Sequence, residues 1–186
     1  MKKPYLVGIA GGTASGKSTF CDKLVNTLEQ LKVKPVHMDG YFKPKNERPY
    51  TEAFVTGKKY VDDNHPLTMD LDKLKIDVAA LSHEDWDVII IEGLLTLWDK
   101  ALYETLDLKL FIDCKPDERI VRRIRRNMQK GLNFDDITNV YLDMVRYRHE
   151  EYVEPSKWRA DLIINGSQSS EISMTIISEH IKRSIQ

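Results

Sequence analysis

The chain has 186 residues, 41% of them hydrophobic and 31% charged, a size and composition typical of one compact domain, or two at most, with a full core. Its 28 lysines and arginines nearly balance 29 aspartates and glutamates, and the net charge of -1 argues against a general nucleic-acid-binding protein, whose domain is usually clearly basic. Two cysteines cannot form a disulfide scaffold, and apolar runs of about four residues are much shorter than the roughly 20 that a membrane span needs, so we expect a cytoplasmic protein without a membrane segment.

Apolar runs and helical patterns alternate along the chain. In chain order we predict a strand at 5–10, a helix at 16–31, a strand at 34–38, a helix at 70–81, strands at 87–91 and 108–113, helices at 116–129 and 135–153, a strand at 160–164 and a helix at 171–185. Residues 40–68 have weak periodicity and read as a long functional loop or lid. Because the strands are continuous apolar runs, we predict an α/β fold: a parallel sheet with helices on both faces, in a single domain over residues 1–186.

A glycine-rich segment follows the first strand and opens the first helix. Residues 11–18 fit the pattern GxxxxGK[ST], in which backbone N–H groups and a helix N-terminus surround a phosphate. Lys17 is expected to reach the β- and γ-phosphates, and the Ser18 hydroxyl to bind Mg²⁺. The residues expected at the nucleotide are Gly11, Gly12, Thr13, Ala14, Ser15, Gly16, Lys17, Ser18 and Thr19. The structural alternative is a glycine-rich turn with an incidental lysine.

Carboxylates follow two of the predicted strands, at the sheet edge where open α/β sheets bind ligands. Asp39 comes after the 34–38 strand and could accept a proton from a substrate hydroxyl and help to hold Mg²⁺. Glu92 comes after the 87–91 strand and could hold the metal through water. The alternative is that Asp39 begins a turn and Glu92 caps the next helix. Asp113 also follows a strand, and we expect it to be structural, in a turn or as a helix N-cap.

Five arginines fall within eight residues of the predicted 116–129 helix. Four of them, Arg119, Arg122, Arg123 and Arg126, are spaced so that they share one helix face. Guanidinium groups on such a face can neutralise charge during phosphoryl transfer, so we predict a lid at about residues 119–133, with Arg123 catalytic and Arg126 at the nucleotide. The alternatives are a solvated basic face or a nucleic-acid contact.

Together these motifs resemble the uridine kinase and phosphoribulokinase family of P-loop kinases. The resemblance is carried by residues 11–18, by His37-Met38-Asp39-Gly40-Tyr41-Phe42, Ile91-Glu92-Gly93-Leu94-Leu95, Arg122-Arg123-Ile124-Arg125-Arg126 and Glu154-Pro155-Ser156-Lys157, and by residues 160–166. Residues 39–44 are also similar to nicotinamide riboside kinases. The resemblance implies a five-stranded parallel sheet of nucleotide-kinase type, ATP and Mg²⁺, and transfer of the γ-phosphoryl group to a hydroxyl. It implies that Asp39 is the base, that Glu92 lies near the metal, and that Arg123 and Arg126 line the lid.

The chain departs from that family on the acceptor side. Uridine kinases carry a hairpin that grips the pyrimidine before the strand ending in the Glu-Gly pair, and residues 73–87 are too short for it. The lid is one residue short and has Leu132 where a second lid arginine is usual. The residues expected to face the acceptor are Tyr41, Arg48, Tyr60, Asp63 and His65, with Tyr60 as a substitute stacking surface.

Other conspicuous side chains have structural interpretations. We expect Trp86, Trp98 and Trp158 to be packing anchors, and Arg146, Arg148 and His149 to form a solvated face of the 135–153 helix.

The leading hypothesis is an ATP-dependent kinase of a small molecule, a nucleoside, riboside or sugar-like acceptor, with catalysis by positioning and charge neutralisation. The alternative is a nucleotide-binding regulatory or switch module without an acceptor, against which the sequence shows no Asn-Lys-x-Asp-type guanine segment. Neither nucleic acid nor membrane is expected as a partner, and a homo-oligomer is left open.

Overall fold

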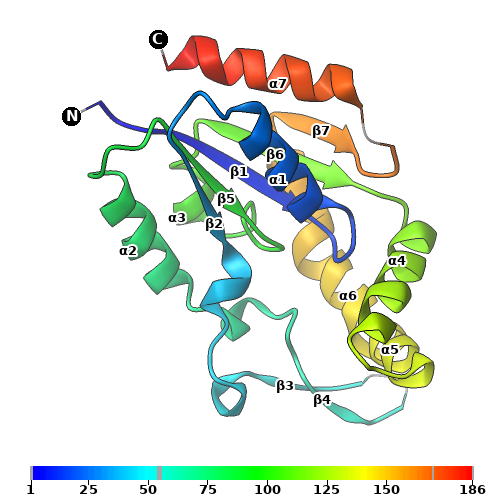
Figure 1. The fold of residues 1–186 in the computed structure, drawn as a ribbon. Helices are drawn as coiled ribbons and strands as arrows, with labels where there is room; N and C mark the ends of the chain where they lie inside the picture. Colours follow the sequence, from blue (N-terminus) through cyan, green and yellow to red (C-terminus); the bar gives the residue numbers. More distant parts are fainter. Residues whose placement is uncertain (1, 54–55, 169, 186) are drawn as a thin grey trace.

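A five-stranded parallel sheet with the strand order β2-β5-β1-β6-β7 forms the centre of the fold in the computed structural model, which describes residues 2–53, 56–168 and 170–185 (Figure 1). The strands are β1 (Tyr5–Gly11), β2 (Val33–His37), β5 (Val88–Glu92), β6 (Leu108–Asp113) and β7 (Leu162–Asn165). All four pairings are parallel. The predicted five-stranded parallel sheet is therefore confirmed, and each strand end lies within two residues of its expected position.

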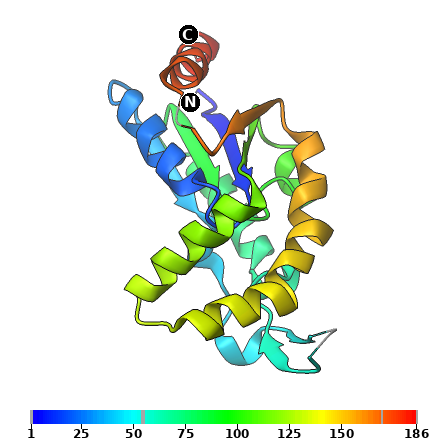
Figure 2. The ribbon, with the colours of Figure 1, turned by 90° about the vertical axis from the view of Figure 1, so that its right-hand side faces the viewer.

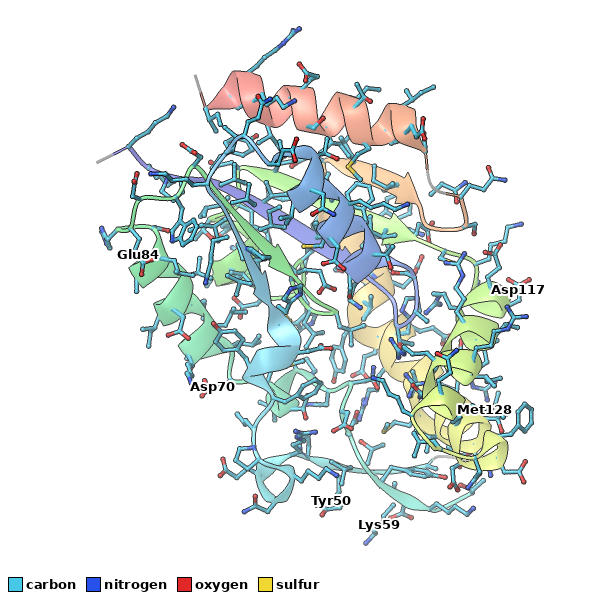
Figure 3. The ribbon with its side chains drawn as sticks, in the orientation of Figure 1. Tyr50, Lys59, Asp70, Glu84, Asp117 and Met128 are labelled. Atoms are coloured by element: carbon cyan, nitrogen blue, oxygen red, sulfur yellow. The ribbon has the colours of Figure 1, made fainter. Side chains whose placement is uncertain are left out.

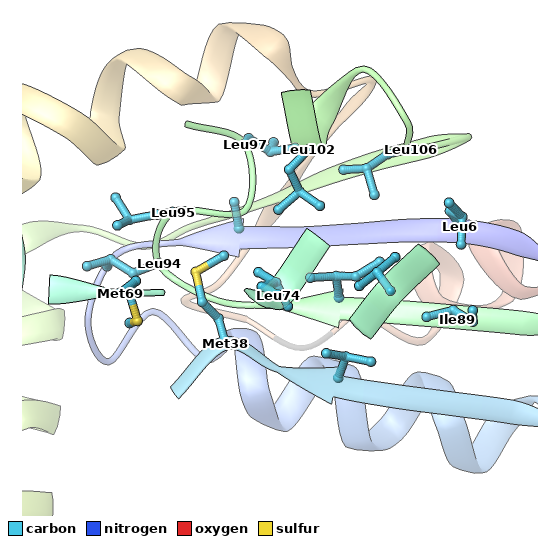
Figure 4. Close-up of a cluster of buried hydrophobic side chains, with 14 of the residues drawn as sticks. Leu6, Met38, Met69, Leu74, Ile89, Leu94, Leu95, Leu97, Leu102 and Leu106 are labelled. Carbon is cyan, nitrogen blue, oxygen red and sulfur yellow. The ribbon is translucent and has the colours of Figure 1, made fainter. Parts of the chain in front are cut away.

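Helices cover both faces of this sheet (Figures 1 and 2). On one face, α1 (Lys17–Thr27) and α7 (Glu171–Ser184) pack through Leu24 and Ile177 on a cluster that includes Ile9 and Ile90. On the other face, α2 (Leu71–Leu81) and the short α3 (Lys100–Tyr103) pack through Leu74 and Leu102 (Figure 4). Burial of these apolar side chains is the main favourable term that holds the layers together. Among the described residues, no helix combines the length and apolarity needed to cross a bilayer.

Two long helical segments lie at the carboxyl end of the sheet, and the second runs back along the sheet, where Val153 joins the cluster of Leu74 and Leu102 (Figure 2). The first is α4 (Pro116–Gln129), which has Pro116 in its first turn. After a turn at Gly131, whose φ is +88°, α5 (Phe134–Val140) begins at Asn133, whose side chain accepts a hydrogen bond from the Asp136 N–H. The chain stays helical through a π segment (Tyr141–Val145), α6 (Arg146–Arg148), a second π segment (His149–Val153) and a 3₁₀ segment (Glu154–Arg159). The predicted helix over 135–153 is confirmed as one run, although parts of it are π-helical.

The structure corrects the sequence-based expectations at several points. The first helix ends at Thr27 instead of residue 31, because the Leu28 N–H closes the last turn on Leu24 and Val25. The 40–68 segment contains an antiparallel hairpin of β3 (Tyr50–Glu52) and β4 (Lys59–Val61), and three 3₁₀ turns, Met38–Tyr41, Lys45–Glu47 and Pro66–Thr68, occur in this part of the chain. Trp158 is 80% exposed and is not a packing anchor, whereas Trp86 and Trp98 pack against the core.

Candidate active site

The glycine-rich segment forms a loop between β1 and α1 at the carboxyl end of the sheet. Ala14 and Gly16 have φ values of +58° and +99°, in the left-handed region, and the Ser15 N–H bonds to the Gly12 carbonyl over 3.1 Å. These angles turn the chain sharply so that α1 begins at Lys17 with its N-terminus at the loop. The N-cap Gly16 supplies no side chain, so the first N–H groups of α1 are available to an anion.

Several buried polar atoms around this loop have no hydrogen-bond partner among the described residues. They are Oγ of Ser15, Nη1 of Arg119 and Nε of Arg123. Buried donors of this kind are normally satisfied, and guanidinium groups are satisfied best by carboxylates or phosphates. The loop and its surroundings therefore fit a bound polyphosphate.

Glu92 is the central carboxylate of the site. It is 5% exposed at the end of β5, and its Oε1 accepts a hydrogen bond from Ser18 over 3.1 Å and lies 3.6 Å from Lys17 Nζ. Its Oε2 lies 3.1 Å from His37 Nδ1. The parallel register explains this meeting, because Glu92 pairs with His37 of β2 on one side and with Ile9 of β1 on the other. The alternative in which Glu92 caps a helix is wrong.

Asp39 lies one strand further along the same sheet edge, in the 3₁₀ turn that follows β2. Its carboxylate is exposed and makes no hydrogen bond or ion pair with the described part of the chain. An unengaged carboxylate at the same sheet edge as Glu92 can accept a proton or bind a cation. No group of three or more His, Cys, Asp or Glu side chains within the described residues could hold a metal ion by itself. Mg²⁺ does not need such a cage, since it is usually bound by one or two carboxylates together with substrate phosphates.

The arginine face of α4 is turned toward the phosphate loop, as the spacing predicts. Arg123 donates to the Thr13 hydroxyl over 2.9 Å, and Arg126 reaches the same oxygen at 3.5 Å. Burial, followed by the neighbouring Arg126 charge, lowers the pKa of Arg123. Arg125 is exposed on another face of the helix. The solvated-face alternative is therefore wrong for Arg123.

The other two arginines of this face act on the protein backbone. Arg122 donates to the Gly166 carbonyl over 2.8 Å, and Arg119 is buried and donates from Nε to the Cys114 carbonyl over 3.0 Å. A Cβ on Gly12 would stand 2.5 Å from Arg119 Nη1 and 2.9 Å from His149 Cε1, so a larger residue there would displace these side chains from the loop.

A cavity of about 660 Å³ adjoins the loop, a volume in the range of small-molecule sites. It is lined by residues 14–20, Lys23, Ile112, Arg122, Arg126 and residues 164–167. Lys17 and Ser18 lie at its wall, and Ile112 and Ile164 give it an apolar side. This combination suits a nucleotide whose phosphates lie on the loop and whose base lies near β6 and β7.

Most residues expected at the acceptor are close in sequence to the β3–β4 hairpin, which Tyr50 and Lys59 mark in Figure 3. Arg48 precedes β3, Tyr60 lies in β4 and Asp63 and His65 follow it, whereas Tyr41 lies in the 3₁₀ turn after β2. Arg48 donates to Asp63 over 2.8 Å and lies 4.6 Å above the Phe42 ring. Asp63 is 53% exposed, and its negative charge partly opposes the lowering of the Arg123 pKa by burial.

The three other expected acceptor residues are engaged with the protein. Tyr60 donates its hydroxyl to Asp143 over 2.8 Å, and His65 accepts the Leu67 N–H and rests edge-on against Tyr152. Burial, with the Asp77 carboxylate second, raises the pKa of Tyr41 to about 12, so its hydroxyl faces α2.

The sequence-based view of the 135–153 helix needs correction. Arg148 is not solvated: it forms an ion pair with the fully buried Asp62, with Nε 2.7 Å from the carboxylate. The His149 side chain is 12% exposed, and its ring reaches the phosphate loop at Gly12. Asp113 is not an N-cap, because Lys115 holds that position, and it pairs with Lys157 at 3.6 Å. The two ion pairs could be suspected from the sequence only through the opposite charges of their residues, because the partners are far apart in the chain.

Comparisons with known proteins agree with this geometry. The sequence model of the "Phosphoribulokinase / Uridine kinase family" matches residues 68–173. A uridine kinase from Clostridium botulinum (strain Okra / Type B1) is 32% identical over an alignment of 206 positions that covers both chains completely. A uridine kinase from Lactococcus lactis subsp. lactis (strain IL1403) is 30% identical, with 97% of each chain covered. The solved structure of phosphoribulokinase from Rhodobacter spheroides superposes with a TM-score of 0.64 at 14% identity, covering 90% of this chain and 74% of the other.

Proposed function

The chain belongs to the phosphoribulokinase and uridine kinase family and is an ATP-dependent kinase that phosphorylates a hydroxyl of a small molecule, and we propose that this acceptor is a nucleoside or another riboside. The observation that carries the proposal is the contact of Lys17 and Ser18 with Glu92, with the unengaged Asp39 at the same edge of the sheet. This arrangement has a phosphate-binding end, a cation-binding centre and a base.

Different residues of the chain bind the phosphates, accept the proton and stabilise the transferring group. The loop over residues 11–18, with Thr19, holds the phosphates through backbone N–H groups, and Lys17 neutralises the β- and γ-phosphates. Asp39 orients the acceptor hydroxyl and accepts its proton as the new bond forms. Arg123 and Arg126 turn from Thr13 to the transferring group and stabilise its charge. Mg²⁺ would be held by the Ser18 hydroxyl, Glu92 and Asp39, and would neutralise phosphate charge when bound.

The acceptor side supports a riboside that is not gripped as a pyrimidine. Only residues 82–87 connect α2 to β5, which leaves no room for a base-gripping hairpin between them. Arg48 and Asp63 present a donor and acceptor pair that suits vicinal sugar hydroxyls. We therefore expect weak discrimination between uridine and ribosides with other bases.

The test is an assay of ADP release over a panel of pyrimidine, purine and non-nucleoside ribosides with ATP and Mg²⁺. We expect Lys17→Ala to abolish ATP binding, measured by calorimetry, and Asp39→Asn to keep ATP binding but reduce kcat by about 10²- to 10⁴-fold. Asp85→Asn is the matched control, because Asp85 is an exposed aspartate outside the site, and it should retain full turnover. ATP hydrolysis that no acceptor stimulates would refute the proposal and favour a switch module, and full turnover by Asp39→Asn would refute the role of Asp39.

A further inference from the structure

An ion pair between the buried Asp62 and Arg148 joins the β3–β4 hairpin to α6. Asp62, directly after β4, is 0% exposed. Its carboxylate receives Arg148 Nε at 2.7 Å and the Asn64 N–H at 3.2 Å. Thr51 of β3 also donates its hydroxyl to Asp62, and it accepts a hydrogen bond from Arg148 Nη2 over 2.9 Å. Arg148 therefore binds β3 and the residue directly after β4 through one guanidinium group.

A second contact joins the same two parts of the chain about one turn earlier in the helical run. The Asp143 carboxylate is buried and accepts hydrogen bonds from Thr56 and Tyr60, each over 2.8 Å. Both carboxylates are thus satisfied across the interface between hairpin and helix. In Figure 3 the hairpin, marked by Tyr50 and Lys59, lies beyond the carboxyl end of the sheet. The main β-sheet does not continue into it, since β3 and β4 pair only with each other.

The ion pair connects with the acceptor side through the next residue. Asp63 follows Asp62, so the anchoring of Asp62 restricts where Asp63 can point. Asp63 in turn holds Arg48, whose Nε donates to the Lys43 carbonyl over 2.6 Å and whose guanidinium covers Phe42. Phe42 comes directly after the 3₁₀ turn that contains Asp39. A continuous chain of contacts therefore runs from α6 to the turn that carries the base.

We propose that Arg148 is a positioning residue for the acceptor: through Asp62 it fixes the β3–β4 hairpin, and thereby sets Asp63 and Arg48 to receive the sugar hydroxyls. This inference rests on the proposed kinase function for its kinetic consequence. Arg148 does not touch the nucleotide cavity, so its loss acts on the acceptor and not on ATP. A lysine cannot reproduce the forked contact with Asp62 and Thr51, because only the planar guanidinium presents several donors at once.

The experiment compares Arg148→Met, Arg148→Lys and the neutral pair Asp62→Asn/Arg148→Gln with wild type. Glu151→Gln is the matched control, because it removes the other carboxylate bound to Arg148 and leaves the hairpin contact intact. We expect Arg148→Met to raise the acceptor KM about tenfold or more, equivalent to about 1.4 kcal/mol. The KM for ATP should change less than about twofold. Arg148→Lys should be intermediate, and the neutral pair, which buries no lone charge, should recover most of the loss.

A second readout does not depend on turnover. Amide hydrogen exchange of β3 and β4 should accelerate in Arg148→Met and stay at the wild-type rate in Glu151→Gln. An unchanged acceptor KM, an equal rise in both KM values, or unchanged exchange of the hairpin would overturn the inference. If Arg148→Met fails to fold, Arg148→Lys and the neutral pair decide by the same criteria. A wild-type protein that phosphorylates no riboside defeats the proposed function instead, and the exchange rates then decide whether Arg148 fixes the hairpin.

Discussion

His149 is a largely buried histidine whose protonation should control stability in mildly acidic solution. Its Nε2 lies 3.2 Å from Glu154, and a Cβ on Gly12 would stand 2.9 Å from its Cε1. Burial, with the positive charge of Arg119 second, lowers the pKa of His149 to about 4 from an ordinary value near 6.5. Glu154 and Asp113 oppose this shift without reversing it.

The number of protons bound by the folded and unfolded states determines how the free energy of unfolding depends on pH. Between about pH 4 and pH 6.5 the unfolded chain holds a proton at His149 that the folded protein does not, so the free energy of unfolding rises with pH. The contribution is fully present above the unfolded pKa and is lost as the pH falls toward 4. The shift of about 2.5 pKa units corresponds to about 3 kcal/mol in total, of which about 2 kcal/mol is lost between pH 7 and pH 5.

Urea unfolding of wild type and His149→Gln at pH 7 and pH 5 measures this contribution. Wild type should lose about 2 kcal/mol more than His149→Gln over this interval, because glutamine does not titrate. His83→Gln is the control, since His83 is exposed, and it should follow wild type. Against the effect of burial, the hydrogen bond and charge of Lys157 lower the pKa of Glu154, and the pKa of Lys157 is raised by Glu154, so neither group changes charge appreciably between pH 7 and pH 5. Parallel losses in wild type and His149→Gln would refute the reasoning.

Three further predictions concern the glycine after β5, the arginines of α4 and the metal. Gly93→Ala places a Cβ 2.3 Å from Met38 Cβ, so we expect a loss of about 1–3 kcal/mol in a thermal melt, while Gly40→Ala, with nothing within 4 Å of its Cβ, should be close to neutral; equal melting temperatures would refute this. Arg123→Met should lower kcat about 10²-fold or more, whereas Arg125→Met, on the exposed face, should keep the wild-type kcat, and similar rates for the two would argue against the lid. Removal of divalent cations with EDTA should abolish turnover and excess Mg²⁺ should restore it, so activity that persists in EDTA would exclude the proposed cation.

The features that the sequence predicted well are those that local pattern determines. Continuous apolar runs such as Val88–Ile91 locate the strands, because a strand between two helical layers is apolar on both faces. The glycine loop is also local, since its conformation depends on a few adjacent residues and the helix that follows. The position of Asp39 and Glu92 at one sheet edge follows once the strands are known to be parallel. The spacing of the α4 arginines gave their common face in the same way.

Neither the β3–β4 hairpin nor its ion pair with α6 could be predicted from local sequence pattern. Strands of three residues are too short to show alternation, and β3 and β4 are joined through residues that lie partly outside the described chain. Arg148 and Asp62 are 86 positions apart, and a charged residue on a helix is usually solvated. The burial of that pair depends on tertiary structure, because Asp62 and Arg148 come into contact only when the helical segment packs against the hairpin.

Although the net charge of the chain is close to zero, its basic and acidic residues are concentrated in different segments. Residues 115–130 carry seven basic and two acidic side chains, whereas residues 61–92 carry nine acidic and two basic ones. Arg123 and Arg126 converge on the Thr13 hydroxyl, a neutral group that cannot offset their mutual repulsion, and Asp63 is the carboxylate of the acidic segment whose charge acts on Arg123. The positive charge of the lid therefore exceeds what its protein neighbours neutralise. We infer that the phosphates of a bound nucleotide supply the missing negative charge and strengthen the contact between α4 and the loop.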